Sequence, residues 1–139
     1  MSELVLRPVV LGDDEDADER FIMDSWLTSL RKSPDSNLPD KFFFPAYRAI
    51  AKFLLVNSQV RVLVPKEEPS LILGYIVYDP GMVHWVYVKR NTRGNGLAKK
   101  MIELAGPNPV LTMTTPLGRK RLRWPVRTKV LRQKLNREL

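Results

Sequence analysis

Two periods alternate in the pattern of apolar and polar residues along this chain, one typical of strands and one typical of helices. Five segments are typical of strands. In each of them, β-branched and aromatic residues either form a continuous run or alternate with polar residues. These segments cover residues 3–10, 59–65, 71–79, 82–89 and 109–115. Turn-forming residues separate the middle three, at 66–70 and at Asp79-Pro80-Gly81. The pattern therefore predicts five strands, the middle three joined by short turns.

Three other segments have apolar residues at helical spacing, and the predicted helices cover about 17–31, 46–57 and 97–105. In the first, Ile22, Trp26 and Leu30 recur every four residues and mark one apolar stripe. The second is predicted to have Pro45 at its first helical position, where a missing N–H costs nothing. Gly106-Pro107 ends the third.

The predicted elements follow the order β-α-α-β-β-β-α-β. Helices that both precede and interrupt a run of strands predict an α/β (α+β) domain, a mixed sheet flanked by helices. We expect one domain over residues 1–118. Residues 119–139 form a separate basic C-terminal segment, in which Val130, Leu131 and Leu135 suit an amphipathic helix after Pro125. This segment is expected to pack on the domain or to extend from it.

Composition excludes several kinds of chemistry. The chain has 139 residues, no cysteine and a single histidine. Disulfides, thiolate catalysis and cysteine or histidine metal clusters are therefore excluded, and we expect no metal. No apolar run reaches the length of a membrane span, and no signal peptide opens the sequence. We expect a cytoplasmic protein that is neither secreted nor membrane-spanning.

The net charge of +8 is concentrated at one end of the chain. Residues 1–118 carry 14 basic and 14 acidic side chains, whereas residues 119–139 carry nine basic side chains and one acid. Arg119, Lys120, Arg121 and Arg123 form the densest cluster, which is typical of a site for nucleic acid or an acidic protein. A solvated face of a packed helix explains the same charges equally well.

The segment from Val83 to Ile102 gives the most specific indication of a binding site. It predicts a strand, then the basic glycine loop Arg93-Gly94-Asn95-Gly96, then a helix. Small residues in the loop allow successive backbone N–H groups to converge, and the start of the helix adds unpaired donors. The spacing fails both the Walker pattern and the dinucleotide pattern. A diphosphate is the expected ligand.

The loop resembles that of the GCN5-related N-acetyltransferase (GNAT) superfamily, whose pyrophosphate loop reads Arg-x-x-Gly-x-Gly/Ala, here Arg93 to Ala98. The order of elements over about residues 4–115 also resembles that family. The resemblance implies acetyl-CoA as cofactor and acetyl transfer to an amine of a protein or small molecule. The family usually continues with a further helix, two strands and a tyrosine that protonates the leaving thiolate, whereas no tyrosine follows Tyr87 here.

The resemblance also implies the residues that bind the cofactor. Backbone groups of Val86, Tyr87 and Val88 would pair with the pantetheine as an added strand does. The pyrophosphate would be wrapped by the loop and the first helical turn: Arg93, Gly94, Asn95, Gly96, Leu97 and Ala98. We expect Gly96 to matter most, because a side chain there would occupy the space of the phosphate. A turn glycine with positive φ is the alternative.

Acetyl transfer to an amine also requires a base, and His84 has the only unperturbed pKa near neutrality. By strand alternation we place it on the same face as Val86 and Val88, with a buried, hydrogen-bonded histidine as the alternative. Tyr47 or Tyr78 would have to replace the missing tyrosine, although core packing explains both. Thr112 and its neighbours on the last strand are candidates for binding substrate or water.

Three functions remain open on the sequence alone. The first is an N-acetyltransferase, and a compact, cysteine-free and strongly basic version of this fold would suit a bacterial or phage genome. The second is a non-catalytic relative that binds CoA, or a polyanionic partner through its basic C-terminus. The third is a nucleic-acid or acidic-partner binding module in which the glycine loop is only a turn. Neither the acceptor nor the oligomeric state follows from the sequence.

Overall fold

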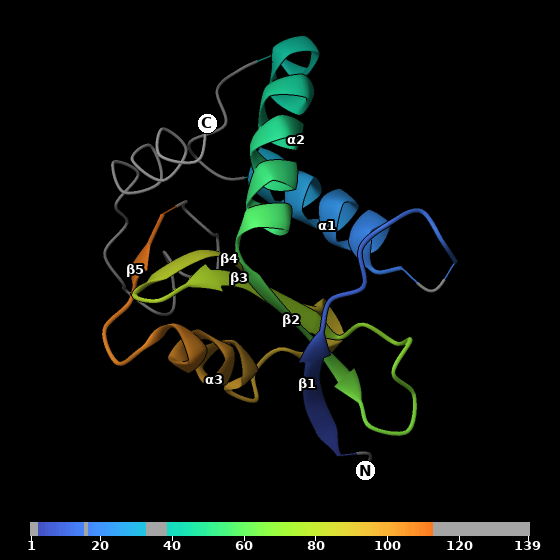
Figure 1. Ribbon diagram of the computed structural model, residues 1–139, viewed down its shortest axis with the longest axis vertical. Helices are drawn as coiled ribbons and strands as arrows, with labels where there is room; N and C mark the ends of the chain where they lie inside the picture. Colours follow the sequence, from blue (N-terminus) through green and yellow to red (C-terminus); the bar gives the residue numbers. More distant parts are fainter. Residues whose placement is uncertain (1–2, 16, 33–38, 113–139) are drawn as a thin grey trace.

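The computed structural model describes residues 3–15, 17–32 and 39–112 (Figure 1). Its strands are β1 (Leu4–Pro8), β2 (Gln59–Pro65), β3 (Gly74–Asp79), β4 (Met82–Val88) and β5 (Val110–Leu111). Its α-helices are α1 (Glu19–Arg31), α2 (Asp40–Asn57) and α3 (Leu97–Ile102). Two short 3₁₀ turns, η1 (Arg90–Thr92) and η2 (Glu103–Ala105), flank α3. The predicted order of strands and helices is confirmed.

The strands form one sheet in the order β1-β2-β3-β4-β5. β1 to β4 are antiparallel to their neighbours, and β5 is parallel to β4. The long connection from β4 to β5 contains α3, as a parallel crossover requires. Helices α1 and α2 lie on one face of the sheet and α3 lies on the other (Figure 1). The predicted mixed sheet with helices on both faces is therefore confirmed.

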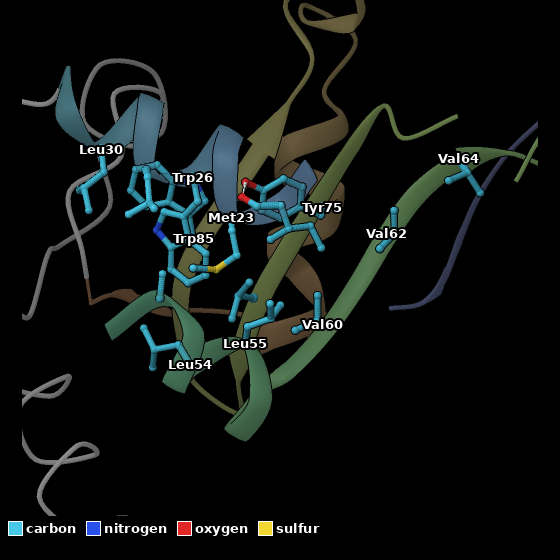
Figure 2. Close-up of a cluster of buried hydrophobic side chains, with 14 of the residues drawn as sticks. Met23, Trp26, Leu30, Leu54, Leu55, Val60, Val62, Val64, Tyr75 and Trp85 are labelled. Atoms are coloured by element: carbon cyan, nitrogen blue, oxygen red, sulfur yellow. Dashed lines mark hydrogen bonds between the residues drawn. The ribbon is translucent and has the colours of Figure 1, made fainter. Parts of the chain in front are cut away.

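Each face of the sheet has its own apolar core. Under α1 and α2, the fully buried rings of Trp26 and Trp85 stack with their centroids 5.8 Å apart (Figure 2). The predicted stripe of α1 is buried here. On the other face, Val86 and Val88 of β4 pack with Met101 of α3. Side chains from both faces of β4 are therefore buried, and the strand lies between the two cores.

Helix α2 begins earlier than the sequence pattern predicts. It starts at Asp40, where the Phe43 N–H donates to the carbonyl oxygen of Pro39 (2.9 Å), and Pro45 lies inside the helix. Pro45 has no N–H to offer the carbonyl four residues earlier, so the prediction placed the start of the helix at this proline. Burial of the Phe43 ring in the first core compensates for the lost hydrogen bond.

Strand β3 begins at Gly74 rather than at Leu71. A Cβ at Gly74 would lie 2.5 Å from the carbonyl oxygen of Tyr87, so only glycine allows β3 to approach β4 this closely. Upstream, the Leu73 N–H still donates to the Leu63 carbonyl (2.9 Å), although residues 71–73 are not strand. Strand β5 is assigned only at Val110–Leu111, and the predicted continuation to 115 lies outside the described residues.

Candidate functional site

The pairing between β3 and β4 shifts by one residue at His84. Tyr78 pairs with Val83 and Val77 pairs with Trp85, so β4 has one more residue than β3 at this point, and the extra residue is His84. A β-bulge of this kind bends the strand and increases its local twist. The residue types of 82–88 are uniformly strand-like, and for that reason the sequence does not predict the bulge.

The bulge lies next to the last pairing between β4 and β5 that the described residues contain. The two strands pair at Met82↔Val110 and Val83↔Leu111. The last hydrogen bond between the described parts of the two strands runs from the Thr112 N–H to the Val83 carbonyl oxygen (3.0 Å). Beyond it β4 continues to Val88, and no strand within residues 39–112 lies along its outer edge. We call this stretch, from His84 to Val88, the open edge.

Alternation along β4 decides which backbone groups face the open edge. The Lys89 N–H donates to the carbonyl of Leu73, on the β3 side (2.7 Å). Residues at even separation from Lys89 therefore face β3, whereas Val86 and Val88 direct their N–H and C=O groups outward. Of the predicted cofactor-binding residues on this strand, Val86 and Val88 thus have the geometry to pair with an added chain, and the backbone of Tyr87 pairs with Tyr75 of β3.

The open edge leads directly into the glycine loop. After η1, Gly94 and Gly96 have φ of 96° and 69°, in the left-handed region that favours glycine. The Arg93 N–H still donates to the Arg90 carbonyl, and the Lys100 N–H donates to that of Gly96. Between these two bonds, the amides from Gly94 to Lys99 have no acceptor among the described residues. These unpaired amides are the donors that the sequence predicted for an anion.

The Arg93 side chain lies against the end of β4. Its Nε donates to the Val88 carbonyl oxygen (2.7 Å), so the last acceptor of the open edge is already bonded. The same bond fixes the plane of the guanidinium, which keeps its terminal nitrogens for another partner. In the loop, the Asn95 Nδ2 donates to the Thr92 carbonyl (3.2 Å) and closes the turn.

His84 is fully buried and bonded through both ring nitrogens. Nδ1 lies 2.7 Å from the Thr112 Oγ1, and Nε2 lies 2.8 Å from the Asp79 Oδ2, which also accepts from the Ser58 hydroxyl (3.3 Å). A neutral ring donates to Asp79 and accepts from Thr112, whose hydroxyl is also 3.5 Å from the Val83 carbonyl oxygen. A charged ring donates to both, with the hydroxyl turned to Val83. The cluster accommodates both protonation states.

The sequence-based placement of His84 on the face of Val86 and Val88 is wrong. Val86 and Val88 pack in the core under α3, whereas His84 bonds Asp79 and Thr112. Each of these two residues follows a residue of that core, Tyr78 and Leu111 respectively, and so points to the face of α1 and α2. The bulge reverses the alternation and moves His84 to the opposite face from the one predicted.

The tyrosines proposed as replacement acids both pack within the domain. Tyr47 lies on α2, with its ring 4.7 Å from that of Phe43 in the first core. Tyr78 is buried in the second core, and its hydroxyl donates to the Gln59 Oε1 (3.2 Å). These contacts are those of packing residues.

A groove of about 670 Å³ lies between α1 and the end of β4. Its described lining is Phe21, Asp24, Ser25, Thr28 and Ser29 of α1, with Lys32 just after the helix and Tyr87, Arg90 and Arg93 opposite. The apolar stripe of α1 does not indicate this groove. The signal was present as a second stripe of small hydroxyl residues spaced three or four apart.

Tyr75 is buried behind the groove and fixes α1 through Ser25, which lines it. Its hydroxyl lies 2.7 Å from the Ser25 Oγ and donates to the Ile22 carbonyl (3.1 Å). Burial raises the pKa of Tyr75, so the hydroxyl stays protonated at physiological pH. The ring of Tyr87 stacks on that of Tyr75, with centroids 5.3 Å apart, and meets Phe21 edge-on. These ring contacts pack α1 against β3 and β4.

The predicted polyanion-binding cluster of Arg119, Lys120, Arg121 and Arg123 lies outside the described residues. Within the described part, no group of three His, Cys, Asp or Glu side chains is placed to hold a metal ion. In the same part of the chain, no helix has both the length and the apolar character of a membrane span.

No protein-family model matches the sequence, and no curated protein matches it. Among solved structures, apo YjaB from Escherichia coli aligns with a TM-score of 0.52 and 14% identity, over 74% of this chain and 64% of that one. YncA from Salmonella typhimurium, a candidate acetyltransferase with its cofactor acetyl-CoA, aligns with a TM-score of 0.44 and 18% identity, over 75% of this chain and 61% of that one. A ribosomal-protein-alanine N-acetyltransferase from Brucella melitensis aligns with a TM-score of 0.45 and 19% identity, over 73% of this chain and 68% of that one.

The alignment with YjaB shows a shared fold. The alignments span less than two thirds of the YjaB and YncA structures. At this level of identity the likeness concerns architecture, and activity does not follow from it. The resemblance to the GNAT superfamily stays a prediction from the loop and the order of elements.

Proposed function

We propose that this chain is an acetyl-CoA-dependent N-acetyltransferase that acts on an amine. One observation carries the proposal: the open edge of β4 is followed, after the short turn η1, by the unpaired amides from Gly94 to Lys99. An extended chain that pairs with a strand edge and ends in a diphosphate matches this sequence of donors and acceptors. Pantetheine pyrophosphate is such a chain.

The backbone groups of the described residues have positions that suit binding of CoA. Val86 offers an N–H and a C=O to the amides of the pantetheine, and the amides from Gly94 to Ala98 offer donors to the pyrophosphate. Because the Val88 carbonyl is bonded to Arg93, its N–H is the group of that residue left for the ligand. When bound, acetyl-CoA supplies an acetyl group activated as a thioester.

His84 and Thr112 would accept and pass on the proton that the acceptor amine loses. The amine attacks only when neutral, and an N–C bond then forms as the C–S bond breaks, with the amine proton ending on the thiol or in solvent. The Thr112 hydroxyl lies beside the last described pairing of β4 with β5, and His84 connects it to Asp79, whose side chain is 17% exposed. We assign His84 as a relay behind Thr112.

A non-catalytic protein that binds CoA is the second candidate. Two observations favour it: His84 is fully buried with both ring nitrogens bonded, and the Val88 carbonyl is bonded to Arg93. Binding of nucleic acid or an acidic protein by residues 119–139 stays a prediction from charge. Release of free thiol from acetyl-CoA with an amine panel separates the two candidates, since only the enzyme releases it above the rate in buffer.

The loop assignment is tested by Gly96→Asp, measured as CoA affinity by calorimetry. The new carboxylate would face the pyrophosphate, and the repulsion of like charges is expected to weaken binding at least about tenfold. The fold should survive, because nothing lies within 4 Å of a Cβ at Gly96. Aspartate also tolerates the left-handed conformation better than most residues do.

Gly96→Asn is the matched control, since it has the same shape and backbone preference without the charge. We expect it to bind CoA more tightly than Gly96→Asp. Equal affinity of Gly96→Asp and the unmodified protein would remove the loop from the CoA site.

A further inference from the structure

The groove between α1 and β4 lies beside the proposed path of the thioester. Tyr87 forms its wall on the β4 side, next in sequence to Val86 and Val88 of the open edge. Arg93 lines the groove and also bonds the Val88 carbonyl, so groove and open edge meet at this side chain. A molecule in the groove would therefore lie next to the acyl carrier and on the other face of the sheet from α3.

Among the described lining residues, positive charge exceeds negative charge. Lys32, Arg90 and Arg93 line the groove, whereas Asp24 is the one acid among them. None of the three cations pairs with a carboxylate in the described part of the chain. Cations that face one groove without a counter-charge create a positive potential, which attracts an anionic ligand.

Hydroxyl groups line the α1 side. Ser25 is committed to Tyr75 and to the carbonyls of Phe21 and Ile22. Thr28 and Ser29 lie one turn further along the same helix, toward Lys32. Together with the arginines they provide the donors that an oxyanion accepts from, and the rings of Phe21 and Tyr87 provide apolar surface between them.

We propose that this groove binds the acceptor, and that the acceptor is a small amine carrying an anionic group, a carboxylate or a phosphate. A volume of about 670 Å³ is that of a site for a small molecule. The anion binds Lys32 and Arg90, and Asp24 receives the ammonium of the incoming amine. Polyamines and lysine-rich peptides are disfavoured by repulsion. This inference rests on the proposed acetyl transfer.

The test uses amine pairs that differ in the anionic group alone: L-phenylalanine against L-phenylalaninamide, and phosphoethanolamine against ethanolamine, with spermidine as a cationic amine. Thiol release from acetyl-CoA gives kcat/KM for each. We expect the anionic member of at least one pair to exceed its neutral partner about tenfold or more, as a charge-assisted hydrogen bond provides. The pair that shows the preference identifies carboxylate or phosphate.

The variants Lys32→Ala and Arg90→Ala test whether the preference for an anionic amine arises in the groove. Each is expected to raise KM for the anionic amine about tenfold, leaving kcat, the neutral amine and CoA affinity unchanged. Lys66→Ala is the control, since it removes the same charge outside the groove, where Lys66 pairs with Glu3. A loss of CoA affinity in the groove variants would assign the groove to the carrier and overturn the proposal.

Failure of this inference differs from failure of the proposed function. Acetylation of neutral or cationic amines at rates equal to the anionic ones overturns the acceptor class and leaves the transferase intact. If no amine is acetylated, binding of the same pairs to the CoA complex, measured by calorimetry, still decides the class. Tighter binding of the anionic members supports the groove assignment, and equal or absent binding overturns it.

Discussion

At the scale of single residues, His84 joins the geometry of the sheet to the chemistry of the site. As the extra residue of the bulge it lies next to the last described pairing of β4 with β5, and its ring links Asp79 to Thr112. Residue type alone identified His84 as a candidate. Its face and its partners could not be predicted, because one extra residue reverses the alternation of a strand.

Thr112→Val tests the role of this cluster. Valine keeps the shape of threonine but removes the partner that lies 2.7 Å from the His84 Nδ1. A buried polar group that loses its partner is expected to cost about 1–3 kcal/mol of unfolding free energy, measured by urea denaturation. If Thr112 passes the amine proton, kcat also falls and its pH profile shifts, while CoA affinity is unchanged.

Thr28→Val is the comparison for stability, because Thr28 is an exposed residue of α1. It should change the free energy of unfolding by less than about 0.5 kcal/mol. A loss of stability in Thr112→Val with an unchanged kcat and pH profile would show that the cluster only supports the fold.

At the scale of elements, α1 serves two purposes on two faces. One stripe, containing Trp26, is buried in the core, and the neighbouring stripe of hydroxyl residues lines the groove. The position of α1 is held by Tyr75 from the sheet and by Lys52 from α2. A helix fixed from both sides keeps the groove at a constant width.

The ion pair between the helices makes part of the stability depend on pH. The hydrogen bond from the Lys52 Nζ holds the pKa of Glu19 below its usual value. The stabilisation is therefore present above the pKa of Glu19 in the unfolded chain, and it is lost as the pH falls through the lowered pKa of the folded state. Glu19→Gln removes this dependence.

We expect Glu19→Gln to be less stable than the unmodified protein at pH 7, by at most about 1 kcal/mol for so exposed a pair. The difference should shrink toward zero as the pH falls through the lowered pKa of Glu19 in the folded state, since below it Glu19 is protonated in both states. Urea unfolding at pH 7 and at a series of acidic pH values measures this. A difference that persists unchanged at low pH would mean that the pair with Lys52 does not contribute through charge.

At the scale of the whole molecule, the order of strands and helices and the mixed sheet followed from periodicity. Periodicity succeeds here because both faces of the sheet are covered, which makes its strands β-branched and aromatic and its helices amphipathic. The start of α2 was missed because burial of Phe43 outweighs the cost of Pro45 inside the helix. Tertiary packing of this kind is not visible in a local pattern.

The site was predicted in part. The glycine loop was identifiable because glycine at Gly94 and Gly96 is required by the backbone, which is a local property. The groove and the cluster around His84 unite residues from α1, β3, β4 and β5 that are distant in sequence. Their chemistry depends on how these elements pack, and a single sequence contains no direct signal of that packing.

The backbone amides from Gly94 to Ala98 are proposed to donate hydrogen bonds to the diphosphate of an acyl carrier. Titration of ¹⁵N-labelled protein with CoA, followed by amide ¹H–¹⁵N spectra, tests it at the level of individual N–H groups. We predict saturable shifts that are largest for the amides from Gly94 to Ala98 and for Val86, with little change in β1 and β2. Absence of saturable shifts, or shifts confined to residues away from the loop and the open edge, would contradict the account.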